Sequence, residues 1–322
     1  MKIKRALSIV FTLSLLLAGC VKDDLSDCGI RVRYQYVKNV DGVDRFATSV
    51  DKITLFVFNG DGHYIGTFTE EGEKLKDPSY RMPVNLMPGQ YRLVAWGNLY
   101  EEYEHPGLTA NETHINDLLL SLRAEGNRVE DFPTHLFFGE QTIEIIRDDI
   151  GRTDVLVDMM KNTNTIHVTI KGLPVESYYV DEAGEPTERM PFTCHISSVN
   201  RHHKFDNSLT GSDRLTYIPR QRISEAEQTL SPHFVTMREL NDGSTGSRLT
   251  ILNTRSDETI SNTLPDVLLD TELTQYLIAA SVTKDLDIDD EYHLEIVFSY
   301  TNNTVTVLIN DWVVTEEEWV VG

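Results

Sequence analysis

Residues 50–66, "VDKITLFVFNGDGHYIG", predict a β-hairpin and with it the fold class of the chain. An apolar run at residues 53–58 leads into Asn59-Gly60-Asp61-Gly62, and a second apolar run follows at residues 64–68. Asn and Gly tolerate the positive φ that a tight turn demands, so two antiparallel strands are expected here. A calcium loop around Asp61 is the alternative, but the spaced carboxylates and terminal Glu of such a loop are missing.

Strand patterns flank this hairpin in the first half of the chain. Ile30, Val32, Tyr34 and Tyr36 alternate with polar residues, a period of two that places one set of side chains on a buried sheet face. A Pro-Gly turn at residues 87–90 leads into a strongly apolar strand. Further strands are expected at residues 135–138, 141–146 and 155–160.

One segment of the first half predicts a helix instead. Ile115, Leu118, Leu119 and Leu122 fall at i, i+3, i+4 and i+7. The spacing of Thr109 and Glu112 is that of a capping box. We expect this helix to cover part of a sheet or to cross its end.

The strand pattern restarts near residue 160 with "KNTNTIHVTIKGLP", residues 161–174. We place a domain boundary at residues 158–163, which divides the chain into residues 28–160 and 161–322. The second half again consists of short strands, with one helical patch at Leu273, Tyr276, Leu277 and Ala280. Many short strands separated by turns predict an all-β chain with two β-sandwich domains in tandem.

The N-terminus has the pattern of a lipoprotein signal. Lys2, Lys4 and Arg5 precede an apolar run that ends at Ala18, shorter than the about 20 residues that span a membrane. The order Leu17-Ala18-Gly19-Cys20 resembles the lipobox of bacterial lipoproteins, which implies cleavage before Cys20, a diacylglyceryl group on its sulfur and an acyl group on its amine. Residues 1–19 are then the signal peptide and residues 20–27 a lipidated linker. An ordinary signal peptide with an incidental cysteine is the alternative.

Composition limits the partners. The chain is 40% hydrophobic and 25% charged, as in a folded protein, and its formal charge is −22. Loss of Lys2, Lys4 and Arg5 with the signal would make the charge of the mature chain −25. Such a surface repels phosphate backbones and anionic lipid, so nucleic-acid binding is not expected.

The cysteines leave one pair open. If Cys20 carries lipid, Cys28 and Cys194 remain of the three cysteines in the chain. An oxidising envelope permits a disulfide between them. The sequence does not show whether their Cα atoms come within about 7 Å, the distance that a disulfide requires. Cys194 as a small buried hydrophobe is the alternative.

No catalytic motif stands out. The chain lacks His-Glu-x-x-His, Gly-x-Ser-x-Gly, a phosphate-binding Gly-rich loop and Cys-x-x-Cys. His202 and His203 are adjacent, and adjacent side chains on a strand point to opposite faces, so they cannot chelate together. The acidic run Asp285, Asp287, Asp289, Asp290 and Glu291 is read as a solvated loop rather than a calcium site. We therefore expect no enzyme activity, no metal and no cofactor beyond the lipid.

Several of these segments together resemble a known family. The lipobox, a cysteine shortly after it, the strand "IRVRYQY", the hairpin, "LMPGQYRLVAWGN", "NTIHVTIKGL" and the terminal "TVTVLINDW" are similar to the fimbrial anchor and accessory lipoproteins of Bacteroidetes. The resemblance implies two transthyretin-like β-sandwich domains and no enzymatic activity. It also implies a role in attaching a fimbria to the outer membrane, limiting its length and supporting adhesion.

The resemblance assigns roles to particular residues as well. Lys22, Asp23 and Asp24 are similar to the signal that exports lipoproteins to the outer face in this group of bacteria; an ordinary charged linker is the alternative. Fimbrial structural subunits join by β-strand addition, and Ile30, Val32, Tyr34 and Tyr36 are the candidate strand that an anchor retains. The tail "VVTEEEWVVG" could donate a strand or simply fray.

Two other function classes stay open at this point. A surface glycan-binding lipoprotein would use exposed aromatic rings, for which Trp96, Tyr100 and Tyr103 are the candidates. A hydrolase would need paired carboxylates, and no pair is singled out by the sequence.

Overall fold

The quoted hairpin is formed by β2 (Lys52–Asn59) and β3 (Tyr64–Glu71), as predicted. The Asn59 side chain makes the turn, because its Oδ1 accepts hydrogen bonds from the backbone N–H groups of Asp61 and His63. The computed structural model describes residues 29–146, 153–173, 178–180, 186–188, 192–224, 229–254, 266–299, 304–309 and 312–318.

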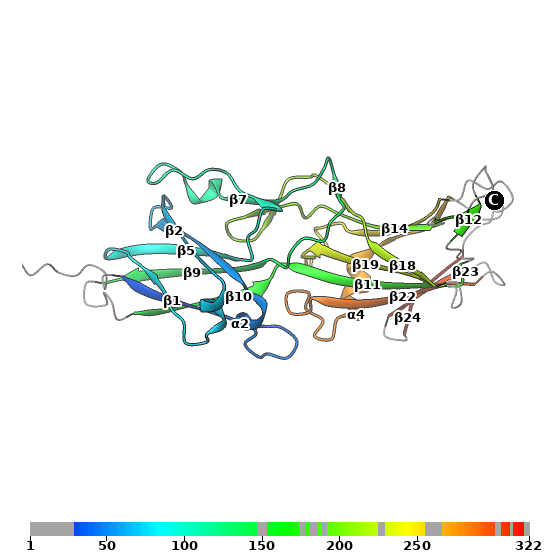
Figure 1. The fold of residues 1–322 in the computed structure, drawn as a ribbon, viewed down its shortest axis with the longest axis horizontal. Coiled ribbons are helices and arrows are strands. Elements are labelled where there is room, and N and C mark those ends of the chain that lie inside the picture. Colours follow the sequence, from blue (N-terminus) through cyan, green and yellow to red (C-terminus); the bar gives the residue numbers. More distant parts are fainter. Residues whose placement is uncertain are drawn as a thin grey trace, which may run out of the picture.

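The hairpin belongs to a seven-stranded sheet with the order β3-β2-β5-β9-β10-β1-β4 (Figure 1). Its other strands are β1 (Ile30–Lys38), β4 (Met82–Val84), β5 (Gly89–Gly97), β9 (Phe137–Ile145) and β10 (Asp154–Lys161). Among the described residues, β9 and β10 pair only at Phe138–Met160 and Phe137–Lys161, so the sheet folds over there. The two parts of the sheet face each other across one hydrophobic cluster, the first core, which includes Ile30, Val32, Leu55, Val57, Leu93 and Val157.

β2 is buried on both faces, which explains its continuous apolar sequence. Because side chains alternate along a strand, Leu55 and Val57 enter the first core. Phe56 and Phe58 point the other way, into a larger cluster that we call the second core.

Two further sheets pack across the second core. One has the order β18-β19-β11-β22-β23-β24 and the other β21-β20-β14-β17-β8. The first comprises β11 (Thr163–Lys171), β18 (Arg220–Ser224), β19 (Thr229–Met237), β22 (Glu291–Ser299), β23 (Thr304–Ile309) and β24 (Trp312–Glu318). The second comprises β8 (Arg128–Val129), β14 (Phe192–Ser198), β17 (Leu215–Tyr217), β20 (Arg248–Asn253) and β21 (Val267–Glu272). The mostly β fold with tandem sandwiches is therefore as predicted.

The two halves of the chain also share strands. A small sheet, β16-β15-β7-β6, pairs residues from before and after position 160, and β8 pairs with β17. The strands of this small sheet are β6 (Tyr103–Glu104), β7 (Leu119–Leu122), β15 (His202–Lys204) and β16 (Leu209–Thr210). A separate pair is formed by β12 (Tyr178–Val180) and β13 (Pro186–Glu188). In Figure 1 the segment with β7 and β8 lies over the top of the molecule and spans both halves.

The helix predicted at residues 115–122 is wrong. The chain forms one 3₁₀ turn, η3 (Ile115–Asp117), and then strand β7. Leu120 pairs with His203 and Leu122 with Tyr103, so distant strands satisfy the backbone that a helix would have satisfied locally. A capping box exists at His114 and Asp117, not at Thr109 and Glu112.

The second helical patch is confirmed as α4 (Leu273–Ala280), whose Leu273, Tyr276, Leu277 and Ala280 are buried. The other short helices in the described part of the chain are α2 (Phe46–Ser49) and η2 (Glu73–Lys76). Among the described residues, no helix is long and apolar enough to cross a membrane.

The strand directions give the molecule two poles. β10 ends at Lys161, and β11 begins at Thr163 in the other half. β1 runs parallel to β10, so Ile30 lies at the end of its sheet that is remote from the second half. β11 and β22 run away from the first half, and Glu318 of β24 pairs with Thr304 at the far end. β1 and β24 accordingly occupy opposite halves of the elongated molecule (Figure 1).

Candidate functional site

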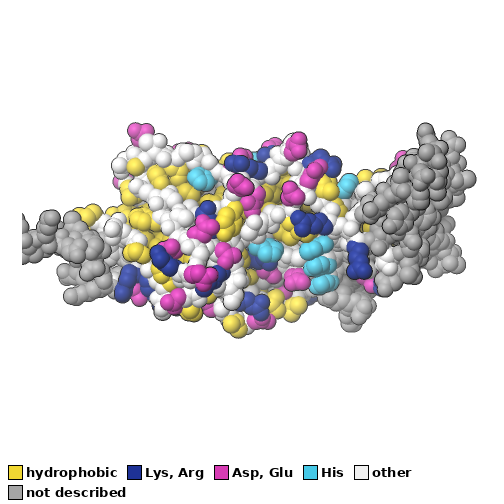
Figure 2. All heavy atoms as spheres, in the orientation of Figure 1, with side chains coloured by type: hydrophobic (Ala, Val, Ile, Leu, Met, Phe, Trp, Pro, Cys, Tyr) yellow, Lys and Arg dark blue, Asp and Glu magenta, His cyan; other side chains and the backbone are white. Residues whose placement is uncertain are grey.

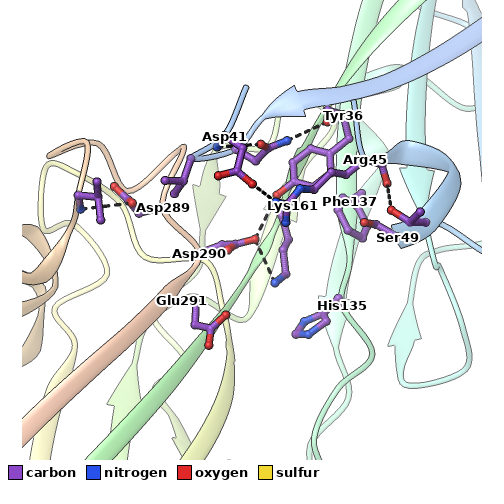
Figure 3. A pocket seen from close by; sticks show the side chains of 14 residues that line it. Tyr36, Asp41, Arg45, Ser49, His135, Phe137, Lys161, Asp289, Asp290 and Glu291 are labelled. Carbon is purple, nitrogen blue, oxygen red and sulfur yellow. Dashed lines mark hydrogen bonds and ion pairs between the residues drawn. The ribbon is translucent and has the colours of Figure 1, made fainter. Parts of the chain in front are cut away.

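A cavity of about 530 Å³ lies between the two halves. β1, α2 and β9 supply one wall, and the acidic segment before β22 supplies the other (Figure 3). The residues that line it include Tyr36, Asp41, Arg45, Ser49, His135, Phe137, Lys161, Asp289, Asp290 and Glu291. We call this region the joint.

Asp290 is the polar centre of the joint. Its Oδ2 accepts a hydrogen bond from the Tyr36 hydroxyl at 3.1 Å and lies 3.0 Å from the Lys161 ammonium (Figure 3). Burial and the nearby Asp290 carboxylate raise the pKa of Tyr36, so this phenol stays protonated and donates. The contact ties β1 of the first half to the segment that precedes β22.

Asp287 makes a second tie across the same boundary. It forms an ion pair with Arg238, whose side chain is only 8% exposed, and lies 3.4 Å from the Lys38 ammonium. Burial lowers the pKa of Arg238, and the Asp287 and Asp285 carboxylates act in the opposite direction. Charged groups of both halves thus converge on one aspartate.

The rest of the acidic run is held by local hydrogen bonds. Burial would raise the pKa of Asp289, but donation from Ser281 and Thr283 outweighs it and the net shift is downward. A hydrogen bond from Asn241 lowers the pKa of Asp285. The prediction of a solvated loop is therefore wrong for Asp289, which is 2% exposed, whereas Glu291 at the end of the run is 60% exposed. Hydroxyl and N–H groups of Ser281 and Thr283 replace water around the Asp289 carboxylate.

The polar groups of the joint have structural partners within the protein. Burial, and next Lys161, lower the pKa of His135 to about 4, so its imidazole is neutral at pH 7. Its Nδ1 lies 3.0 Å from the Thr163 hydroxyl, and the lining carboxylate of Asp290 is already paired with Lys161. Among the described lining residues we find no nucleophile aligned with a base.

The lipid and export residues lie outside the described part of the chain. These are Cys20, Lys22, Asp23 and Asp24, and Cys28 of the possible disulfide lies outside it as well. Cys194 is fully buried in β14, within the second core, and burial raises the pKa of its thiol. Since Cys28 is not described, the pairing of Cys28 with Cys194 stays a prediction.

The candidate retained strand is held on both sides. β1 pairs with β10 in parallel and with β4 in antiparallel orientation. Ile30, Val32, Tyr34 and Tyr36 all point into the first core. The structure therefore places this strand inside a sheet, paired with β10 from Arg31 to Lys38 and with β4 from Ile30 to Val32.

The aromatic residues of the glycan-binding alternative are buried or half-buried. Trp96 is 1% exposed and Tyr103 is 4% exposed, and both belong to the second core. Tyr100 is half-buried, with the Lys52 ammonium 5.1 Å from its ring centroid. The three rings therefore do not form an exposed platform for sugars.

His202 and His203 have separate partners, which fits side chains on opposite faces of β15. The Nδ1 of His202 lies 2.7 Å from the Ser121 hydroxyl. His203 is fully buried, 3.0 Å from the Asn207 side-chain oxygen and 3.2 Å from the Asn200 carbonyl. Each histidine is therefore held by hydrogen bonds to other residues of the chain.

Sequence reasoning missed a cluster on the outer face of the β11–β22 pair. His167 and His293 are paired across the two strands, and Glu291 lies within 3.5 Å of both. The one local signal is Glu291-x-His293, a spacing that puts both side chains on the same face of a strand. His167 is 126 positions away from His293, and its register with β22 is not readable from local sequence.

Comparison with known proteins gives the context. A model of the family "Fimbrillin-A associated anchor proteins Mfa1 and Mfa2" matches residues 25–318. The chain is 30% identical over 178 residues to the major fimbrium anchoring subunit FimB of Porphyromonas gingivalis. This match covers 51% of this chain and 55% of FimB. The chain thus spans about half the length of that relative. It is 21% identical over 233 residues to the minor fimbrium anchoring subunit Mfa2 of the same species, covering 69% of this chain and 67% of Mfa2.

Solved structures share the fold. The fimbrial anchor protein Mfa2 from Porphyromonas gingivalis superposes with a TM-score of 0.71 at 15% identity, covering 90% of this chain and 99% of Mfa2. A Bacteroides ovatus protein described as an adhesin superposes with a TM-score of 0.72 at 18% identity, covering 89% and 95%. The prediction that the chain is not an enzyme agrees with these structural proteins. The chain belongs to the Mfa2 family of fimbrial anchor proteins.

Proposed function

We propose that this protein is an outer-membrane lipoprotein that anchors a fimbria at the cell surface through Cys20 and contributes to fimbrial assembly, length control and adhesion. The observation that carries the proposal is the family match over residues 25–318, which begins five residues after Cys20. Fimbrial structural subunits would be the partners.

The polarity of the molecule supports this role. Ile30 lies ten residues after the lipid cysteine and at the pole remote from the second half. β24 ends at the opposite pole. A lipid attached near Ile30 would put one pole on the membrane and leave the other free to meet a subunit.

Strand addition is the proposed mode of contact. β1 pairs with β10 along one edge and with β4 over Ile30–Val32 on the other, so it is already part of a sheet. β24 is an edge strand of its sheet, paired with β23 alone in the strand order. Unpaired backbone groups at such an edge are a template for another strand. We therefore propose that the next subunit adds to β24.

Replacement of Cys20 tests the anchor. Cys20→Ala removes the sulfur that would carry lipid, so the protein and its fimbriae should be shed into the medium. Cys28→Ala keeps the lipobox intact and should leave them attached. Immunoblots of cell and medium fractions, with electron microscopy of fimbrial length, measure both. Fimbriae that stay attached at normal length in Cys20→Ala would contradict the proposal.

The proposed export signal has its own test. Replacing Lys22, Asp23 and Asp24 by alanine leaves the lipid cysteine in place, so the protein should stay in the membrane fraction. It should become protected from protease added to intact cells. Unchanged surface cleavage would mean that these residues are an ordinary charged linker.

A further inference from the structure

Three histidines stand side by side on the outer face of the second half. His233 of β19 and His293 of β22 each pair in register with His167 of β11. The ring centroids are 4.3 Å apart for His167 and His233, and 4.7 Å apart for His167 and His293. Figure 2 shows a row of histidine side chains on this face. The neighbouring Ile166 and Val168 point the other way, into the second core.

A carboxylate completes the cluster. Glu291 precedes His293 by two residues, so both side chains lie on the same face of β22. Its Oε1 is 3.5 Å from the Nε2 of His167 and 3.5 Å from the Nε2 of His293. One ligand atom from each of the three residues lies within 4.8 Å of the other two.

We propose that His167, His293 and Glu291 bind a divalent transition-metal ion of the Zn²⁺ class. Two imidazole nitrogens and one carboxylate oxygen are ligands that Zn²⁺ accepts, and they leave a fourth tetrahedral position open for water. Hard cations such as Mg²⁺ and Ca²⁺ prefer sites made of oxygens alone and are not expected here.

The geometry requires only side-chain rotation. Zn²⁺ holds nitrogen and oxygen ligands at about 2.0–2.2 Å, so the ligand atoms must approach one another to roughly 3.5 Å. His293 and Glu291 are 68% and 60% exposed, so they are free to turn toward the ion. His167 is 36% exposed and is the more fixed member.

His233 acts as a positioning residue. Its ring stacks on His167 at an interplanar angle of 23°, and the Phe132 ring contacts it from another side with centroids 4.9 Å apart. Its Nε2 is buried and has no hydrogen-bond partner among the described residues. This packing limits the rotation of His167 and keeps its Nε2 on the side of Glu291.

The site would couple two distant parts of the chain. β11 and β22 form a parallel pair, and Glu291 also lines the joint. A bound ion would therefore clamp this pair beside the contact between the two halves. Ligands that bind only the folded state stabilise it, so the ion should raise the melting temperature.

The test uses the full-length chain in detergent without a histidine tag. Isothermal titration with Zn²⁺ should show one site that EDTA reverses, and Co²⁺ should give the visible absorption of a tetrahedral complex. His167→Gln and His293→Gln should each weaken Zn²⁺ binding by more than about tenfold, the smallest loss typical even of second-shell changes. The zinc-dependent rise in melting temperature should disappear with them.

Two variants make the test decisive. His105→Gln removes an exposed histidine far from the cluster in sequence and should bind Zn²⁺ as the unchanged protein does. Glu291→Gln preserves side-chain shape, so weaker binding there cannot be ascribed to misfolding if circular dichroism is unchanged. Binding that survives in the His167→Gln/His293→Gln double variant would show adventitious capture by surface carboxylates and would overturn the proposal.

Discussion

The two hydrophobic cores differ in where their residues come from. Among the described residues, the first core is drawn from residues 30–159. The second core combines Phe56, Trp96 and Phe138 from the first half with residues of the second half such as Phe234 and Ile296. The first half can therefore complete one core alone, whereas the second core depends on both halves.

The cores also differ in their polar content. Among the described residues before position 160, the buried polar side chains are Asn, Thr and Ser. The second half buries Glu239 and His203 completely. Burial raises the pKa of Glu239 although Ser247 and Thr245 donate to it. The second half thus buries completely two side chains that respond to pH, while His135 of the first half is only partly buried.

The largest effect is expected for substitutions in the two cores, measured by the protection of backbone amides from hydrogen exchange. Phe234→Ala opens a cavity in the second core and should lower the protection of β11 and β19 amides by about 3–5 kcal/mol. Amides of β1 and β10 should keep their protection, because the first core is intact. Leu55→Ala should instead lower protection in both halves, by about 2–5 kcal/mol in the first.

These two variants form a matched pair, since both remove a fully buried side chain. If Leu55→Ala leaves the amides of β19 unchanged, the second half folds independently and the shared core does not couple the halves. Global loss of protection in Phe234→Ala would mean instead that the dependence runs both ways.

How far the sequence predicts the fold depends on how local the signal is. Alternation at Ile30–Tyr36 and in the β2–β3 hairpin predicted strands correctly, because burial follows the same period as the side chains. The same i, i+3, i+4, i+7 spacing predicted α4 correctly and failed at β7. At β7 the backbone partners are His203 and Tyr103, and His203 lies more than 80 positions away from Leu120. Local spacing carries no information about such partners.

The candidate sites were harder to predict for the same reason. Asp287 meets Lys38, 249 positions away, only because β1 ends beside the segment that leads into β22. The acidic run was visible in the sequence, but its cationic and hydroxyl partners were not. His167 and His293 were each seen in a strand pattern, and only the parallel register of β11 and β22 brings them together.

Substitution of Asp287 tests whether ion pairs also couple the two halves. Asp287→Ala leaves the Arg238 guanidinium buried without its partner. We expect a loss of about 3 kcal/mol in the free energy of unfolding, the low end for breaking a buried pair because Asp287 is 31% exposed. Asp154→Ala, which removes the partner of the exposed Arg31, should cost less than about 1 kcal/mol. Equal losses in urea denaturation would show that burial of Arg238 is unimportant.

Acid should lower the stability of the fold through His203 of the second half. Burial lowers the folded-state pKa of His203 to about 4, below the unfolded value near 6.5. The unfolded chain then binds the proton more tightly, so this contribution is fully present above pH 6.5 and is lost as pH falls toward 4. At pH 5 the loss is about 2 kcal/mol. His203→Gln should reduce the fall in stability between pH 7 and pH 5 by that amount; an unchanged fall would exclude His203 as its source.

The smallest expected effect concerns Lys38, the ionic tie between β1 and the acidic segment. Its ammonium lies 3.4 Å from Asp287, but the two side chains are 43% and 31% exposed. Water and salt screen such a pair, so Lys38→Met should cost less than about 1 kcal/mol, and even less in high salt. A double-mutant cycle with Asp287→Ala isolates the pair from the Arg238 contribution. A coupling energy above about 2 kcal/mol would mean that exposed charges join the halves as strongly as the shared core does. A small coupling would leave the second core, with Phe56, Trp96 and Phe138 inserted from the first half, as the principal link between them.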